Sequence, residues 1–541
     1  MSYSNKRQEL LIVLSIIIMA VFFRFYQLDS VPPGLWSDEG ANGVDALKAI
    51  DSGDYKLFYS NNNGREGLFI NLQALSIKLL GSTPYALRVV SAIMGVLTVV
   101  GLYMLTRYLF DWRTASIASF LLAVSSWHVI FSRIGFRAIM LPLVLVWVFY
   151  FLWRGLRTGS LYQYIITGII GGLGFYTYFS YRTVPLIALI VFGNYWISLK
   201  KDFNDSAYDH SRNQLLKGFT IMLVVVIIIA LPLGIYFLQH PEDFLKRDGN
   251  PISVFAQNEP LKEFGLSIVK TLGMFNFSGD FNQRHNIPGW PELSIPISLL
   301  FAVGFIKELT HWLRRKHGHF STQHTFLFSW FFIMLLPGFL STEAPHALRT
   351  IGVLPVVMIF SAKGFWLLLN LLKRYHQITD YHSSTDLSSY YREKNILISV
   401  TIIIFLFSLG LLEYSRYFNV WAKEPSLKSA FAQSYMDISD YLNNASPTIT
   451  KYVLVNEGDV LVDDVPNNAQ SIKFLTETYD IQSSTNKNIH YIRSDQVESL
   501  LNSKNNFILI PLANSTELSI KLSETYGLKQ KTQGTLTIYF K

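Results

Sequence analysis

The chain of 541 residues contains no cysteine. Disulfides, thiolate metal sites and cysteine nucleophiles are therefore excluded, whereas the cellular compartment stays open. Charged residues are also scarce, at 16% of the chain, against about 25% in an ordinary soluble domain. The sequence further lacks a Walker loop, a dinucleotide-binding glycine pattern, a Gly-x-Ser-x-Gly elbow and an Asp-x-Asp pair. The sequence therefore does not indicate the nucleotide-binding or catalytic sites that these motifs form.

The shortage of charge is local, because long stretches such as residues 219–238 and 396–412 carry no charge at all. A bilayer-spanning helix needs about 17–25 apolar residues, and the chain holds more such runs than a soluble core would use. The sequence thus predicts a polytopic α-helical membrane protein with about eleven transmembrane helices. Their approximate limits are 8–28, 84–110, 114–131, 137–154, 162–180, 183–199, 218–238, 294–308, 324–341, 350–371 and 395–414.

The flanks of these spans predict the orientation. The first run follows Lys6 and Arg7 as a signal peptide would, but no small-residue cleavage site follows it, so we expect a retained anchor and a cytoplasmic N-terminus. The loops on the same side are then basic, including "RYLFDWR", "WRGLR" and "KELTHWLRRKHGH", in agreement with the positive-inside rule. The net charge of +8 is spread over these loops, and it indicates topology and not nucleic-acid binding. An odd number of spans places the C-terminus outside.

Three segments stand out on the outer side, residues 29–83, 239–293 and 341–349. In the first, "GANGVDALKAIDSG" predicts a helix that stops at Gly53. The following "LFINLQALSIKLLG" predicts an amphipathic helix that lies along the outer membrane interface.

The composition changes after the last span. Short β-like runs, "KYVLVN", "NFILIPL" and "TLTIYF", alternate with polar helical stretches in residues 415–541. We therefore expect a transmembrane domain over residues 1–414, with large outer loops 29–83 and 239–293, and a small extracytoplasmic α/β domain over residues 415–541.

Acidic residues in the first outer loop are candidates for chemistry. Asp38 and Glu39 in "LWSDEG" lie about 100° apart on a helix, so both cannot easily point at one atom. They can equally be N-terminal acids of a helix capped by Ser37. Glu66 in "NGREGLF" is either part of a solvated turn or a partner of Asp38 in binding a metal or raising a base pKa.

Basic residues gather on the same side. Arg133 and Arg137 in "FSRIGFRAIMLPL" are four apart, on one helical face, and can either snorkel or bind a phosphate. His346 and Arg349 in "EAPHALR" are three apart at the start of a span, which favours an anion. A His/Glu metal site is not favoured by this spacing. The candidates for binding a substrate phosphate are Arg65, Arg133, Arg137, Arg284, His285, His346 and Arg349.

These stretches resemble the GT-C superfamily of membrane glycosyltransferases, in its protein-mannosyltransferase and aminoarabinose-transferase-like branch. The matching stretches are "LWSDEG", "NGREGLFINLQALSIKLLGSTPYALRVVSAIMGVLTVVGLYMLTRYLF", "FSRIGFRAIMLPL", "RHNIPG" and "EAPHALRTIGVLP". The resemblance covers about residues 8–412 and implies a GT-C-like fold.

The resemblance implies an enzyme that moves a hexose or pentose from a polyprenyl-phosphate carrier to an acceptor hydroxyl at the outer face, with inversion. It assigns the acceptor base to Asp38, with Glu39 as a close alternative, and it makes Glu66 the second acid of the loop. Gly67 replaces a proline that many relatives carry, which makes the role of Glu66 less secure. Arginine replaces an acid in the outer turn "SRIGFR", which favours a mechanism without a metal. We therefore expect no required cofactor and do not favour a divalent metal.

The expected partners are a polyprenyl-phosphate-linked sugar donor, a glycan, lipid or protein acceptor, and membrane lipid, with no nucleic acid. The expected location is the cytoplasmic membrane of a bacterium or archaeon, with the active site and the C-terminal domain extracytoplasmic. A related alternative is a ligase that moves a whole glycan. A transporter or flippase of a lipid-linked or glycan substrate is the alternative from another class, but it would place ionisable residues within spans, whereas here they gather in outer loops. A sensor or assembly scaffold is the last alternative.

Overall fold

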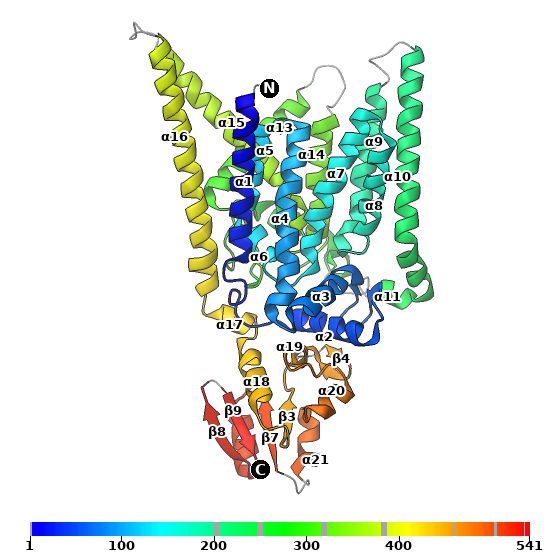
Figure 1. Cartoon of the computed structure of the whole chain (residues 1–541), viewed down its shortest axis with the longest axis vertical. Helices are drawn as coiled ribbons and strands as arrows, with labels where there is room; N and C mark the ends of the chain where they lie inside the picture. Colours follow the sequence, from blue (N-terminus) through cyan, green and yellow to red (C-terminus); the bar gives the residue numbers. More distant parts are fainter. Residues whose placement is uncertain are drawn as a thin grey trace.

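The computed structural model describes residues 3–199, 205–245, 253–314, 322–379, 387–458, 460–501, 506–534 and 536–541. A bundle of long helices forms one part, and a smaller α/β part sits at one end of this bundle (Figure 1). The N-terminus lies at the other end of the bundle. Parts of the basic loops that the sequence predicts on that side, residues 200–204, 315–321 and 380–386, lie outside the described residues.

The bundle is built from apolar helices that coincide with the predicted spans. They are α1 (Tyr3–Phe25), α4 (Pro84–Leu109), α5 (Trp112–Val124), α6 (Ser126–Ser132), α7 (Met140–Thr158), α8 (Leu161–Gly174), α9 (Val184–Leu199), α10 (Asp205–Gln239), α13 (Ile295–Leu313), α14 (Thr322–Phe339), α15 (Leu354–Thr379) and α16 (Leu387–Tyr414). Leucine and isoleucine side chains on the outside of α10, including Ile227 and Ile228, are exposed. An apolar exterior on helices of this length is typical of contact with lipid, and the chain is an integral multi-pass membrane protein.

The number of spans differs from the predicted count. Within the described chain, seven helical stretches are long and apolar enough to cross a membrane, or eight if α5 and α6, bent by 59°, form one broken span. Helix α8 falls short because it has 14 residues. Helices α13 and α14 have polar ends, where Glu308 and His324 lie 3.0 Å apart, and these residues lower the hydropathy of both helices. All three nevertheless run alongside the longer helices (Figure 1).

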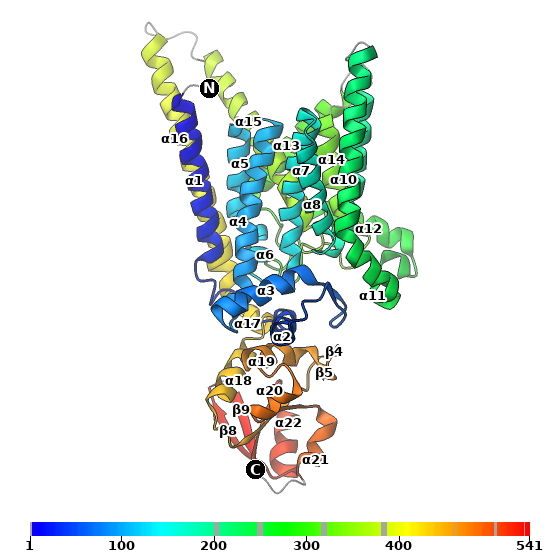
Figure 2. The ribbon, with the colours of Figure 1, turned by 45° about the vertical axis from the view of Figure 1, so that its right-hand side comes forward.

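The outer segments form short elements at the end of the bundle that faces the α/β part (Figure 2). They are α2 (Ser37–Ser52), β1 (Phe58–Tyr59), β2 (Arg65–Glu66), α3 (Gly67–Leu80), η1 (Arg137–Ile139), η2 (Phe179–Thr183), α11 (Pro241–Leu245), α12 (Pro260–Gly273) and η4 (Ile351–Val353). Helix α2 stops at Gly53, which is left-handed at φ 74°, as predicted. Its first residue is Ser37, so Trp36 and not Ser37 is the N-cap.

The C-terminal part contains a five-stranded mixed sheet with strand order β6-β3-β7-β9-β8. Its strands are β3 (Thr450–Leu454), β6 (Ile489–Ile492), β7 (Phe507–Pro511), β8 (Lys529–Gln533) and β9 (Leu536–Phe540). Strands β6, β3 and β7 are parallel, whereas β9 is antiparallel to both β7 and β8. Three of these strands coincide with the predicted β-like runs. Strand β8 has only exposed side chains, which explains why hydropathy did not indicate it.

Helices surround the sheet of the C-terminal part, and one of them contacts α2. They are α17 (Ser426–Ala430), α18 (Gln433–Asn444), α19 (Gln470–Leu475), α20 (Ile481–Asn486), α21 (Val497–Leu501) and α22 (Thr516–Ile520), and a small hairpin, β4 (Leu461–Val462) and β5 (Val465–Pro466), precedes α19. Helix α19 packs directly on α2. A side chain at Gly40 would lie 2.4 Å from the backbone of Ser471, and one at Gly43 would lie 2.4 Å from the ring of Phe474. The two glycines therefore permit this close docking.

Candidate active site

A cavity of about 750 Å³ lies where the loops that include α2, η1 and η2 meet the bundle. Its walls come from segments that are far apart in the sequence: α2, the turn before β2, η1, η2, the end of α14 and the loop that follows it. Its charged and amide-bearing lining side chains are Asp38, Asn42, Asn62, Asn63, Arg65, Arg137, Arg182, His346 and Arg349. The cavity thus combines one carboxylate with several cations.

Asp38 is the acid that reaches this cavity. It is half-buried near the start of α2, and its Oδ1 accepts hydrogen bonds from Nδ2 of Asn62 at 2.8 Å and from Nδ2 of Asn467 at 3.0 Å. Among the residues that the structure describes, none donates a hydrogen bond to Oδ2. Two amides therefore fix the carboxylate and leave one oxygen for a substrate hydroxyl, which is the arrangement that a general base needs.

Glu39 corrects one of the sequence-based expectations. Its side chain is fully buried at 0% exposure and does not line the cavity. Arg88 donates to both carboxylate oxygens, at 3.1 and 3.2 Å, and the backbone N–H of Gly135 donates to Oε1 at 2.7 Å. These bonds tie α2 to α4 and to the turn before η1. Glu39 is therefore a structural anion and is not positioned to act as a base.

Glu66, the third candidate acid of the first loop, is also paired. Glu66 is 2% exposed, and its Oε2 accepts a hydrogen bond from Nε of Arg137 at 2.9 Å. Arg65 lines the cavity, but it donates to Asn42 at 2.6 Å and forms a buried ion pair with Asp45. Arg65 is thereby largely neutralised, whereas Arg137 lines the cavity and is bound to Glu66 through Nε.

The expectation that Arg133 and Arg137 share a helical face is wrong. Helix α6 ends at Ser132 and η1 begins at Arg137, so a turn separates the two arginines. Arg133 points into the protein and is fully buried at 0% exposure. It donates to Tyr417 at 2.9 Å and to three backbone carbonyls near the end of α1, and so it does not bind a phosphate in the cavity.

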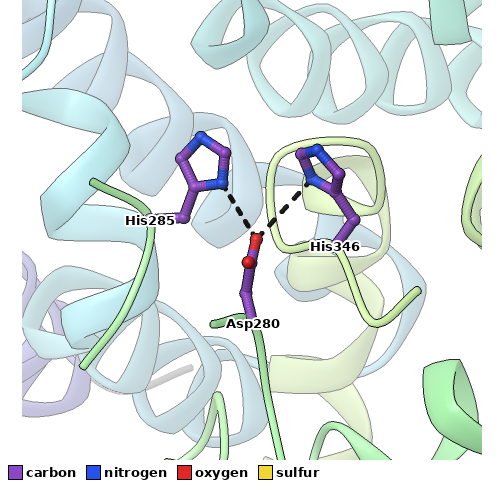
Figure 3. A group of neighbouring side chains, drawn as sticks. All are labelled: Asp280, His285 and His346. Carbon is purple, nitrogen blue, oxygen red and sulfur yellow. Dashed lines mark hydrogen bonds and ion pairs between the residues drawn. The ribbon is translucent and has the colours of Figure 1, made fainter. Parts of the chain in front are cut away.

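Two histidines and one aspartate converge beside the cavity (Figure 3). Oδ2 of Asp280 lies 2.9 Å from Nδ1 of His285 and 3.6 Å from Nδ1 of His346. Burial raises the pKa of Asp280, but the hydrogen bond from His285 and its electrostatic interaction with Asp280 contribute most to holding this pKa below its ordinary value. Burial, followed by the influence of His285, lowers the pKa of His346 to about 3, which keeps its imidazole neutral. Only His346 of the three lines the cavity.

Arg284 lies close enough to Asp38 and Asp280 to interact with both carboxylates. Its guanidinium stacks on the ring of Trp36 at 3.7 Å. It forms no hydrogen bond with any described residue, and its Nε is buried. Burial lowers the pKa of Arg284, and the charges of Asp38 and Asp280 offset part of that effect. This guanidinium does not line the cavity, but its donors remain available to an anion close to it.

Arg349 and Arg182 complete the cationic wall. Arg349 donates to Ser341 at 2.8 Å and forms an ion pair with Glu343. Arg182 in η2 lines the cavity and lies 4.7 Å from the rings of Phe179 and Phe244. The sequence analysis missed Arg182, although the signal used for Arg137, an arginine at a tight outer turn, is also present in "YFSYRTVPL".

Comparison with known proteins bears on this geometry. Residues 68–231, from α3 into α10, match the family described as dolichyl-phosphate-mannose-protein mannosyltransferase. This match covers 164 of the 541 residues. The resemblance to membrane glycosyltransferases is thereby confirmed, and the chain is an enzyme of this glycosyltransferase group. No individual curated protein matches the chain.

Solved structures share the fold of this glycosyltransferase. The structure of ArnT from Cupriavidus metallidurans in the apo state has a TM-score of 0.59 at 13% identity, covering 99% of this chain and 98% of that one. ArnT bound to undecaprenyl phosphate has a TM-score of 0.57 at 14% identity, covering 98% and 97%. The apo oligosaccharyltransferase of Archaeoglobus fulgidus has a TM-score of 0.51 at 14% identity, covering 91% of this chain and 65% of that one. These similarities show a shared fold.

Proposed function

We propose that this glycosyltransferase moves a sugar from a polyprenyl-phosphate carrier to the hydroxyl of a glycan, lipid or protein acceptor, with inversion at the anomeric carbon. The observation that carries the proposal is the cavity itself, where Asp38 keeps one carboxylate oxygen for a hydroxyl opposite Arg137, Arg182 and Arg349. A similar fold, that of ArnT, has been solved with undecaprenyl phosphate bound. That lipid supports the choice of donor.

The reaction needs one base and one cationic site. Oδ2 of Asp38 takes the proton of the acceptor hydroxyl, and the acceptor oxygen forms a bond to the anomeric carbon. The bond between that carbon and the phosphate oxygen breaks, and its electron pair leaves with the lipid phosphate. The guanidinium groups stabilise the phosphate without giving it a proton. A single displacement of this kind inverts the anomeric carbon.

The arrangement of the helices supports a topology with the site on the outer side. We propose that α8, α13 and α14 also cross the membrane, which makes eleven spans with α5 and α6 counted as one. The N-terminus is then cytoplasmic, and the cavity and residues 415–541 are extracytoplasmic in a bacterial or archaeal cytoplasmic membrane. The basic loops that the sequence predicts at the N-terminal end of the bundle, opposite the end that carries the α/β part, support this orientation (Figure 2).

The C-terminal domain takes part in building the site. Asn467 lies just before α19 and donates to Asp38 across a sequence separation of 429 residues. Helix α19 docks on α2 through the contacts at Gly40 and Gly43. We infer that residues 415–541 form a domain that holds α2 and the base in place, in addition to any contact with the acceptor.

The proposal is tested by a transfer assay in membranes with radiolabelled polyprenyl-phosphate sugars. Asp38→Asn removes the base and is expected to abolish transfer. Asp51→Asn is the matched control, because it is the same substitution at the exposed end of the same helix α2. This variant is expected to keep wild-type activity. Full transfer by Asp38→Asn contradicts the base assignment. Movement of a solute or lipid across vesicles without consumption of the sugar donor supports the transporter alternative instead.

A further inference from the structure

We propose that Asp280, His285 and His346 form a binding site for a divalent metal ion of the zinc type at the wall of the cavity. The three side chains come from two outer loops and point toward one another (Figure 3). One ligand atom from each lies within 4.8 Å of those from the other two. Binding of the ion stands on this geometry alone, whereas the role given to the ion below rests on the proposed glycosyl transfer.

The two spacings that involve Asp280 are close to those of tetrahedral coordination. Bonds of about 2.0–2.1 Å to Zn²⁺ set tetrahedral ligand atoms about 3.3 Å apart. The two distances from Oδ2 of Asp280, 2.9 Å to His285 and 3.6 Å to His346, lie on either side of this value. The two imidazole rings have centroids 5.1 Å apart. Shifts of the side chains by a few tenths of an ångström therefore suffice for both bonds to Asp280.

A hydrogen bond between Asp280 and His285 does not account for the whole cluster. Nδ1 of His346 is buried and has no hydrogen-bond partner within the described part of the chain. A buried polar atom without a partner costs free energy, and the proton shared by Asp280 and His285 cannot serve it. An ion bound by Oδ2 and both Nδ1 atoms satisfies all three groups at once, and His285 then carries its remaining proton on Nε2.

The surroundings hold the ligands in place, as outer contacts do in metal sites. Oδ2 of Asp280 accepts a hydrogen bond from the backbone N–H of Ala347 at 2.9 Å, which joins the two loops. The backbone N–H of Asn282 donates to Oδ1 at 2.8 Å, and the backbone N–H of Asp280 donates to buried Glu292 at 2.8 Å. The carboxylate is thus fixed from both sides, which pre-organises the site.

The ion has a place in the reaction. Three protein ligands leave a coordination position open, as in catalytic zinc sites. His346 lines the cavity beside Arg349, and in our proposal the open position lies on that side and takes an oxygen of the donor phosphate. The ion then neutralises the negative charge that this oxygen gains when the bond to the sugar breaks. The sequence analysis disfavoured a metal because "EAPHALR" lacks a compact histidine spacing and because arginine replaces an acid in "SRIGFR".

Binding is tested on the full-length protein in detergent after removal of metals with EDTA. Calorimetric titration with Zn²⁺ is expected to give one ion per chain. His346→Ala and Asp280→Asn are each expected to weaken the affinity at least about tenfold. His240→Ala, at an exposed histidine on the same side, is the matched control and is expected to bind as the wild type does. Absence of Zn²⁺ binding to the wild type, or unchanged binding by His346→Ala, overturns the site.

A spectroscopic measurement keeps the test valid if a variant fails to fold. Wild-type protein loaded with Co²⁺ is expected to show the intense visible absorption of four-coordinate cobalt, and the weak absorption of six-coordinate cobalt contradicts the site. The role of the ion is tested by sugar transfer before and after EDTA treatment, with loss and then recovery on addition of Zn²⁺ expected. Unchanged transfer without metal refutes the role while the proposed function stands. Zn²⁺ binding without any transfer by the wild type refutes the function while the site stands.

Discussion

Replacement of Asn467 by alanine tests whether the C-terminal domain holds the base in place. Asn467→Ala removes one of the two hydrogen bonds on Oδ1 of Asp38 and leaves the bond from Asn62. A hydrogen bond to a charged group contributes about 1.5–3 kcal/mol. If this contribution is realised in the transition state, kcat falls about 10- to 150-fold, because each 1.36 kcal/mol is a factor of ten. KM for the sugar donor is expected to change little, since Asn467 does not line the cationic wall.

The assay is steady-state transfer with purified protein, with kcat and both KM values measured separately. Lys48→Ala is the matched control, because it removes the exposed ion pair with Asp463 between the same two parts of the chain and does not contact Asp38. An exposed pair contributes about 0–1 kcal/mol, so kcat is expected to stay within about fivefold of the wild type. If Asn467→Ala keeps wild-type kcat while Asp38→Asn is inactive, the domain does not position the base. An equal loss in Lys48→Ala attributes the effect to docking in general.

Three further predictions follow from the same contacts. Glu39→Gln leaves Arg88 buried without a full counter-charge, so we expect a loss of about 3–5 kcal/mol in stability, measured as a lower Tm. The folded fraction is expected to retain its kcat. An unchanged Tm with a lost kcat would instead indicate that Glu39 takes part in catalysis. Arg137→Ala is expected to lower kcat/KM for the donor at least about tenfold, and to lower Tm because it leaves buried Glu66 without this partner. The double variant with Glu66→Gln is expected to regain Tm but not activity. Regained activity in the double variant contradicts a role of Arg137 in phosphate binding. Gly43→Val places a new Cβ 2.4 Å from the ring of Phe474. We therefore expect about 1–3 kcal/mol of destabilisation and faster proteolysis of the C-terminal domain. An unchanged cleavage rate contradicts the docking of α19 on α2.

Local pattern was enough for several features of this protein. The apolar runs are helices, α2 ends at Gly53, and the runs "KYVLVN", "NFILIPL" and "TLTIYF" contain strands. These features depend on neighbouring residues, through hydropathy, a left-handed cap and β-branched side chains. The count of spans was less secure, because α13 and α14 place polar residues at helix ends where they meet each other.

The direction in which each charged side chain points could not be predicted. Arg133 and Arg137 cannot be told apart from their sequence context, but the helix ends between them. Arg133 is therefore buried against Tyr417, whereas Arg137 lines the cavity. Asp38 and Glu39 diverge on α2, as their spacing predicts, yet nothing in the spacing says which of them meets Arg88. The choice depends on what α4 presents to α2.

The sequence by itself determined a multi-pass helical membrane protein, an acid-rich first loop and a resemblance that points to glycosyl transfer, because these depend on composition and short motifs. Only the tertiary structure decided that Asp38 faces the cavity, that Glu39 and Arg133 are internal ties, and that Asn467 reaches the base from the far end of the chain. It also brought His346 to Asp280 and His285. A side chain's role depends on the partner opposite it, and that partner is supplied by elements that the chain brings together only when it folds.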